Sequence, residues 1–194
     1  MARWRTEFVI LSEAKNPFTV SSLATKGMLR CAQHDNYFHK ISSRGKTMKP
    51  TPKGWPRISA SIYYREASKM IDWLCAAFGF EVLIKVEGEG GRIEHSELTF
   101  GESLIMVSSE KTGERFGVEQ RSPLSLNGTT QGLLVFVDDV DAHCAHARAA
   151  GAKITDEPKV NDYGEEYWAD RSYAAVDPEG HLWWFTMRVR DQKS

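Results

Sequence analysis

A histidine and a glutamate stand two positions apart near the middle of the chain, at His95 and Glu97. The segment around them alternates apolar and polar residues, which predicts a β-strand, and residues i and i+2 of a strand point to the same face. The two side chains could therefore act as a general acid and base, or Glu97 could accept a hydrogen bond from a ligand amine or hydroxyl. A structural ion pair, for example with Arg92, would explain the same carboxylate without any chemistry. We take His95 and Glu97 as the catalytic candidates.

The other histidines in the second half of the chain carry weaker signals. His143 and His146 stand three positions apart on a predicted amphipathic helix, with Cys144 between them, and we expect ordinary surface imidazoles there. His181 follows a turn and is expected to face solvent. The His-x-Glu pair also matches the opening of the zinc deaminase signature. The Pro-Cys-x-x-Cys that would complete that signature is absent, so we discard this interpretation.

The elements that must position these groups begin after a Pro-rich link at residues 48–56. The helix predicted over Glu66–Phe78 carries one apolar stripe at the i, i+3, i+4, i+7 spacing, and Gly79 is suited to end it. Alternating or apolar runs on either side predict strands. These strands are Ile58–Tyr64, Glu81–Val86, Arg92–Phe100 and Ser103–Val107.

The same order returns after a polar stretch rich in Gly, Ser and Asn. A second helix is predicted over Val140–Ala150, with Asp138 or Asp139 as its N-cap and Gly151 after its end. The strands predicted around it are Gly132–Val137, Lys153–Ile154, Glu165–Val176 and His181–Met187. Each half therefore consists of a strand, a helix and three strands, which predicts an α+β fold built from two βαβββ modules.

Composition limits the possible functions. The 194 residues are 41% hydrophobic and 26% charged, which is ordinary for one globular domain with a tail. Residues 1–47 carry eight Lys/Arg against three Asp/Glu, whereas residues 48–194 carry 17 against 23, so the body is acidic. We expect no nucleic-acid partner and, because no apolar run reaches spanning length, no membrane partner. Three widely spaced cysteines fit a reducing cytoplasm.

These patterns divide the chain into three parts. Residues 1–47 show no sustained period and are expected to be a disordered or artefactual extension, with Met48 as a natural start. The link at 48–56 leads to a domain over residues 57–188. Within it we place the modules at 57–110 and 131–188 and a linker or lid at 111–130.

Several short motifs carry a resemblance across the domain. They are Ile71-Asp72-Trp73 before Phe78-Gly79-Phe80, Val137-Asp138-Asp139-Val140, and the turn Asp177-Pro178-Glu179-Gly180 before an aromatic strand. In this order and spacing, the domain resembles the glyoxalase/bleomycin resistance protein/extradiol dioxygenase superfamily, the vicinal oxygen chelate proteins. The resemblance implies that the modules form a curved mixed β-sheet cup with the helices on the outside.

The resemblance also implies four inward positions that grip a divalent ion in the enzymes of the superfamily. By register they fall on Ser59, Glu97, Gly132 and Trp184, and only Glu97 is a metal-ligand type. We therefore expect no metal and no cofactor, as in a PhnB-like metal-free branch. The expected ligand-binding residues line the cup or a lid over it. They are Ser59, Ser61, Tyr63, Glu97, Phe136, Trp168 and Trp184.

Three functions stay open at this stage. The first is a metal-free protein that binds a small molecule, similar to the bleomycin-resistance members and homodimeric as they often are. The second is a metal-dependent lyase, isomerase or dioxygenase of the same superfamily, with Glu97 as base or ligand. The third is a structural or regulatory module whose sheet edges bind a protein. The aromatic segment Tyr163–Asp170 fits a lid or a dimer edge equally well. We adopt the first function as the working hypothesis.

Overall fold

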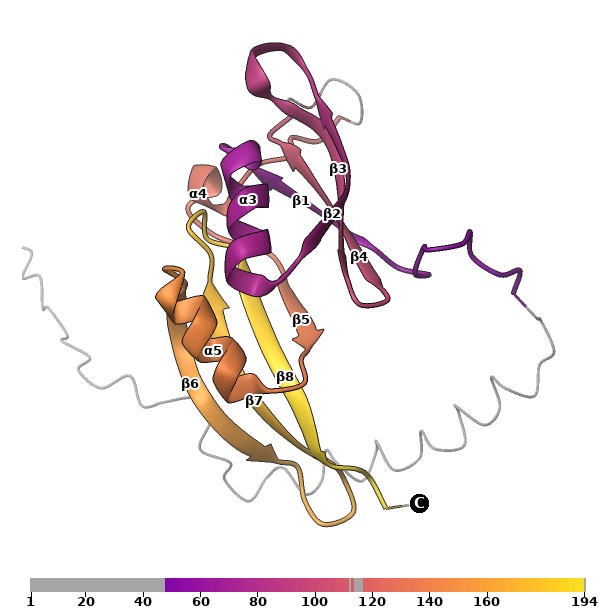
Figure 1. The fold of residues 1–194 in the computed structure, drawn as a ribbon, viewed down its shortest axis with the longest axis vertical. Coiled ribbons are helices and arrows are strands. Elements are labelled where there is room, and N and C mark those ends of the chain that lie inside the picture. The colour runs from indigo at the N-terminus through magenta and orange to yellow at the C-terminus, as the bar shows by residue number, and fades with distance from the viewer. Residues whose placement is uncertain (1–47, 112, 114–116, 194) are drawn as a thin grey trace, which may run out of the picture. The chain divides into compact units, whose positions relative to one another are not determined.

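The computed structural model describes residues 48–111, 113 and 117–193. The predicted extension at 1–47 lies outside the described residues. The fold presented below is that of the compact unit that begins at Thr51 (Figure 1).

The first module starts with a strand and a helix and continues with three strands. Helix α3 buries the predicted apolar stripe, and Gly79 ends it in the left-handed conformation with φ 79°. A short 3-10 turn, Glu89–Gly91, joins the second and third strands. The elements are β1 (Ala60–Tyr64), α3 (Ala67–Phe78), β2 (Glu81–Glu87), β3 (Ile93–Phe100) and β4 (Ser103–Ser109).

The second module repeats this order after the linker. Asp139 caps helix α5, because its carboxylate accepts a 3.0 Å hydrogen bond from the backbone N–H of Ala142. The linker contains a short helix, α4 (Pro123–Leu126), that the sequence analysis does not predict. The elements of the module are β5 (Gly132–Phe136), α5 (Val140–Ala149), β6 (Lys153–Asp162), β7 (Ala169–Val176) and β8 (Leu182–Arg190).

Each module forms its own four-stranded mixed sheet. The strand order is β1-β4-β3-β2 in the first sheet and β5-β8-β7-β6 in the second, and in each the first strand pairs parallel with the last. Both helices lie on the same side of the ribbon in Figure 1, each against its own module. The predicted α+β fold of two βαβββ modules is confirmed.

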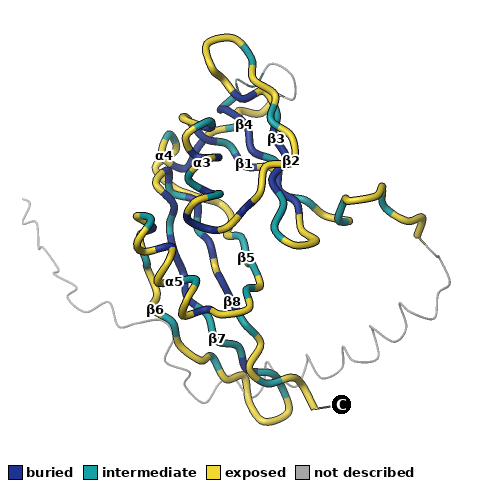
Figure 2. The backbone as a smooth tube through the Cα atoms, in the orientation of Figure 1, coloured by how far each residue is buried: buried dark blue, intermediate teal, exposed yellow. Residues whose placement is uncertain are grey.

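One face of each sheet packs on the helices and builds a core shared by both modules. In the second sheet Trp183 and Phe185 are fully buried on this face, as predicted for the residues that face the helix. Phe78, from the end of α3, packs against both rings, with centroid distances of 5.4 Å and 4.7 Å. Figure 2 shows the buried segments concentrated where the helices meet the sheets. The modules are therefore joined by side chains rather than by a continuous sheet.

The turn Asp177–Gly180 makes the polar part of this connection. Asp177 is buried and accepts hydrogen bonds from Tyr64 Oη at 2.6 Å and from Trp183 Nε1 at 3.0 Å. Burial of the Tyr64 phenol, together with the nearby Asp177 charge, raises its pKa well above the usual value. The carboxylate thus links β1 of the first module to β8 of the second.

Glu179, two residues further, caps the helix of the other module. Its two oxygens accept the backbone N–H groups of Arg65 at 2.7 Å and of Glu66 at 2.8 Å, at the start of α3. Ser122 Oγ, from the linker, donates to the same carboxylate at 2.6 Å. An anion is favourable at a helix N-terminus, and α3 has no capping side chain of its own. The turn motif therefore has a structural role that sequence reasoning missed.

Several strands differ from their predicted bounds; β7, for example, begins at Ala169 rather than Glu165. The strand predicted at Lys153–Ile154 extends to Asp162, and a register shift between Asp156 and Lys159 accommodates Pro158. Proline is tolerated there because β6 is an edge strand. The first strand begins at Ala60 rather than Ile58, so Ser59 precedes β1.

Candidate functional site

The predicted catalytic residues lie on the face of the first sheet that points away from α3, which we call the cup face. Glu97 pairs with Met106 of β4, and Met106 pairs with Ser61 of β1, so all three share this face. The Glu97 side chain is almost buried, and its Oε1 lies 3.1 Å from His95 Nε2. The structure therefore brings His95 and Glu97 into contact. Tyr63 is on the same face, and its hydroxyl accepts a hydrogen bond from Ser61 at 3.1 Å.

The cup face of the second sheet is apolar and aromatic. Leu134 of β5 pairs with Trp184 of β8, and Phe136 pairs with Thr186. Trp184 is 49% exposed, although its neighbour Trp183 is fully buried. The alternation places the Trp184 ring opposite the core, where the register mapping predicted it.

The remaining predicted ligand residues lie elsewhere. Ser59 precedes β1, and its hydroxyl is buried without a hydrogen-bond partner among the described residues. Trp168 lies just before β7, in the β6–β7 hairpin, with the Arg188 guanidinium 5.4 Å from its ring centroid. The ring of Tyr163 packs on Trp168 at 5.6 Å. These contacts hold the aromatic segment against the second sheet, to which Arg188 belongs.

The structure corrects the expectation of a surface imidazole at His143. Its Nδ1 lies 2.6 Å from Tyr173 Oη and its Nε2 lies 3.2 Å from Phe78 O, so the ring joins α5 to the end of α3. The ring also packs on Phe185, with centroids 4.3 Å apart. Burial lowers the pKa of His143, which favours the neutral ring.

His181 also differs from the prediction, because it is buried rather than exposed. Its Nε2 lies 3.0 Å from Tyr63 O, and its ring packs edge-on against Tyr64. Its Nδ1 has no hydrogen-bond partner. The turn is folded against the first module, which buries the residue that follows it.

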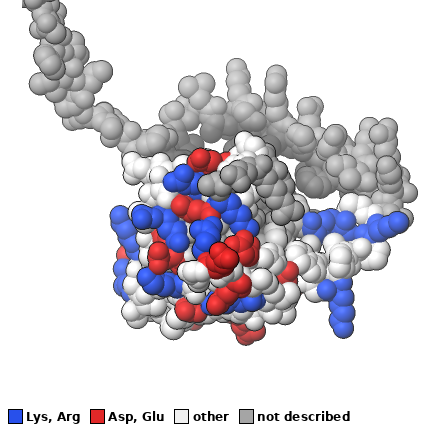
Figure 3. Space-filling model, turned by 90° about the horizontal axis from the view of Figure 1, so that it is seen from above, with Lys and Arg blue, Asp and Glu red and all other residues white. Residues whose placement is uncertain are grey.

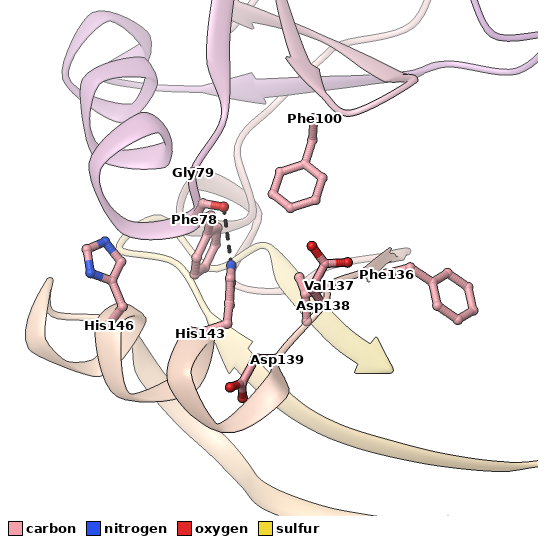
Figure 4. Close-up of a pocket in the computed structure, with 9 residues that line it drawn as sticks. All are labelled: Phe78, Gly79, Phe100, Phe136, Val137, Asp138, Asp139, His143 and His146. Carbon is pink, nitrogen blue, oxygen red and sulfur yellow. Dashed lines mark hydrogen bonds between the residues drawn. The ribbon is translucent and has the colours of Figure 1, made fainter. Parts of the chain in front are cut away.

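Three cavities lie near these groups. One of about 370 Å³ lies where the end of α3 meets the start of α5, and we call it the junction cavity (Figure 4). A larger one of about 800 Å³ adjoins it and shares Phe100, Phe136, Val137 and Asp138 with it. A small one of about 70 Å³ is lined in part by Ser61, Tyr63, Arg121 and His181.

Only some of the predicted ligand residues line these cavities. Phe136 lines the two larger cavities, and Ser61 and Tyr63 line the small one. Glu97 and Trp184 line none of the three. The cup faces are thus separate from the junction cavity, apart from Phe136.

A metal site was tested against the donors present. Within residues 48–111, 113 and 117–193, no group of three or more His, Cys, Asp or Glu side chains is placed to hold an ion. Of the four mapped positions, Glu97 is the one that offers a metal ligand. The residues described do not fit the divalent ion that the superfamily's enzymes carry.

Charges on the surface are mixed. Seen from above in Figure 3, Lys and Arg side chains alternate with Asp and Glu over the described part of this face. Ion pairs such as Arg121–Glu119 at 3.0 Å and Lys69–Glu66 at 2.8 Å join some of the surface charges. That no nucleic acid binds stays a prediction. Among the described helices, none has both the length and the apolar character needed to cross a membrane.

Comparison with known families identifies the domain. The family model described as the Glyoxalase/Bleomycin resistance protein/Dioxygenase superfamily matches residues 57–185. An uncharacterized protein of Mycobacterium bovis is 29% identical over 136 residues, which cover 70% of this chain and 86% of that protein. An uncharacterized protein of Mycobacterium tuberculosis H37Rv shares the same identity, with 76% of its length covered.

Solved structures show the same fold. TioX from Micromonospora sp. ML1 is 32% identical, with a TM-score of 0.53, and the match covers 69% of this chain and 99% of that one. A hypothetical protein of S. aureus has a TM-score of 0.51 at 13% identity and covers 73% of this chain and 96% of its own. At that identity the second likeness concerns the fold alone.

Proposed function

Because the chain belongs to the glyoxalase/bleomycin resistance protein/dioxygenase superfamily, we propose that it binds a small organic molecule in the cup without a resident metal ion. The observation that carries this proposal is the exposed indole of Trp184, which stands on the cup face at a position where the superfamily's enzymes place a metal ligand. An exposed indole beside Leu134 and Phe136 offers a flat apolar surface.

The first sheet adds polar selectivity to this surface. A nearly buried carboxylate in contact with one imidazole favours a partner that donates a hydrogen bond, because burial removes the competing water. Glu97 would therefore accept from an amine or hydroxyl of the ligand, and the Trp184 face would stack on a planar or cationic part of it. The ligand class is a small molecule with an aromatic or cationic body and a donor group.

The test is a thermal-shift screen of the full chain with planar amines and hydroxylated aromatics, followed by calorimetry of the hits. We expect Trp184→Ala and Glu97→Gln each to weaken binding about tenfold, since stacking and a buried charged hydrogen bond are each worth about 1–3 kcal/mol. Val118→Ala and Asp72→Asn are the matched controls, because both side chains are exposed and lie off the cup faces, in the linker and on α3 respectively. A screen without hits, or hits that bind both cup variants normally, would refute the proposal.

The contact between His95 and Glu97 favours one alternative, a divalent-metal-dependent lyase, isomerase or dioxygenase. Metal analysis of protein purified without chelator separates the two functions. A stoichiometric metal that Glu97→Gln loses would support the enzyme, whereas substoichiometric metal in both proteins supports the binding protein.

We also propose that the protein is a cytoplasmic homodimer. Edge strand β2 exposes four large apolar side chains, Val82, Leu83, Ile84 and Val86, which a second copy would cover. Cys75 and Cys144 are free thiols, as a reducing compartment would keep them. Light scattering after size exclusion gives the mass directly, and a monomer at high micromolar concentration would contradict the dimer.

A further inference from the structure

The junction cavity combines aromatic walls with a carboxylate. Its nine lining residues come from the end of α3, the end of β3, the end of β5 with the segment that joins it to α5, and α5 itself. Phe100 and Phe136 contribute two rings, and in Figure 4 the Asp138 carboxylate points toward Phe100. Asp139 points away from that ring and caps α5. The figure draws no hydrogen bond between Asp138 and any other residue that lines the cavity.

We propose that the junction cavity binds a small organic ammonium ion, with its charge beside Asp138 and its alkyl groups against Phe100 and Phe136. Aromatic faces attract cations through the ring quadrupole, and desolvation strengthens that attraction. A volume of about 370 Å³ is within the usual range of ligand pockets, about 300–1,000 Å³.

The electrostatic surroundings favour a cation over an anion. Of the nine lining residues, two are aspartates and none is lysine or arginine. The C-terminal end of α3 also lies here, and the carbonyl end of a helix dipole is negative. The positive end of α5 is offset by the Asp139 cap and by Asp141 in its first turn.

The two histidines of the cavity do not oppose this charge. His143 Nε2 and His146 Nε2 lie 3.2 Å and 2.7 Å from the α3 carbonyl oxygens of Phe78 and Ala76, so each donates its N–H away from a ligand. His143 is additionally held neutral by burial, which lowers its pKa. The two imidazoles are therefore held in place as part of the wall of the junction cavity.

The ammonium site shares Phe136 with the cup and is otherwise distinct from it. Asp138 and Phe100 line the junction cavity but are not on either cup face, whereas Glu97 and Trp184 are on the cup faces and do not line this cavity. An experiment could therefore disprove binding at one site without disproving binding at the other.

Choline and its neutral isostere 3,3-dimethylbutan-1-ol are the probes, titrated into the full chain and followed by proton NMR. We expect a saturable upfield shift of the choline N-methyl signal, caused by the aromatic rings, and binding at least about fivefold tighter than that of the neutral isostere. Asp138→Asn should weaken choline about fivefold and leave the isostere unchanged, and Phe100→Leu should reduce the upfield shift. Asp138 is exposed and caps no helix, so its variant should fold normally.

Two controls make the result specific. Asp72→Asn removes an exposed carboxylate from α3 outside the cavity and should leave choline binding unchanged, as should Trp184→Ala. Equal binding of the two probes, or an Asp138→Asn variant that binds choline like the parent, would overturn the proposal. So would loss of choline binding in Trp184→Ala, since the cation would then occupy the cup.

Discussion

Tyr64 Oη donates a 2.6 Å hydrogen bond to Asp177 Oδ2 across 113 positions of sequence, and both residues are buried. Tyr64 ends the first strand of one module, and Asp177 opens the last turn of the other. A polar bond at this depth defines how the two modules fit together, because a buried acceptor without its donor is costly.

Removing the phenol hydroxyl should therefore destabilise the protein. We expect Tyr64→Phe to lower the free energy of unfolding by about 1–3 kcal/mol, because Asp177 loses a donor and keeps its charge in the interior. Urea denaturation followed by far-UV circular dichroism measures the change. Tyr163→Phe is the control, since Tyr163 is half exposed and should change stability by no more than about 0.5 kcal/mol. Equal midpoints for the two variants would show that the bond contributes nothing.

The cap that Glu179 provides should matter as much. Glu179→Gln replaces one acceptor oxygen by an NH₂ group that faces a backbone N–H at the start of α3. We expect a loss of about 2–3 kcal/mol, the usual value of a buried hydrogen bond to a charged group. Hydrogen exchange should show faster exchange in the first turn of α3, far along the chain from the substitution. Glu165→Gln, an exposed change, should leave both measurements unaltered.

Two adjacent tryptophans test the register of the second sheet. Trp183 is fully buried in the core, so Trp183→Ala should cost about 3–5 kcal/mol of stability. Trp184 is 49% exposed on the cup face, so Trp184→Ala should cost roughly 1 kcal/mol or less. Thermal melts of the two variants give the comparison. A reversed order would mean that β8 presents the opposite face to the core.

Stability should also fall under mildly acidic conditions because of His143. Its pKa is lowered in the folded protein, so the unfolded chain takes up a proton first as the pH drops below its ordinary value of about 6.5. The stability that the neutral His143 ring contributes is therefore present above about pH 6.5 and is lost as the pH falls below that value. Urea midpoints between about pH 8 and pH 5 should fall less steeply for His143→Gln than for the parent. Val118→Ala, an exposed change that removes no titratable group, serves as the control and should keep the parental slope.

Periodic segments were predictable from sequence, and segments defined by distant partners were not. The stripe on α3 and the alternation around Glu97 repeat often enough to fix an element and its faces. The burial of Trp183 and the exposure of Trp184 follow from the same two-residue period of a strand. By contrast, β6 contains Pro158 among charged residues, and its length depends on pairing with β7.

The predictions of exposure for two histidines were wrong for the same reason. His143 and His181 carry no local sign of burial, because residues distant in sequence cover them, among them Phe78 and Tyr63 of the other module respectively. The junction cavity is likewise invisible in the sequence, since Phe100 and Asp138 are brought together by the packing of α3 against α5. The mapped cup positions required the family resemblance together with the strand period.

The Glu179 cap has a consequence for the internal duplication of the chain. A polypeptide cut off after β4 would start its helix with the amides of Arg65 and Glu66 facing water, and its Tyr64 hydroxyl would lack an acceptor. The halves look like repeats of one pattern, yet the first takes its helix cap from the second, so we expect it to hold its shape only once synthesis has passed residue 179.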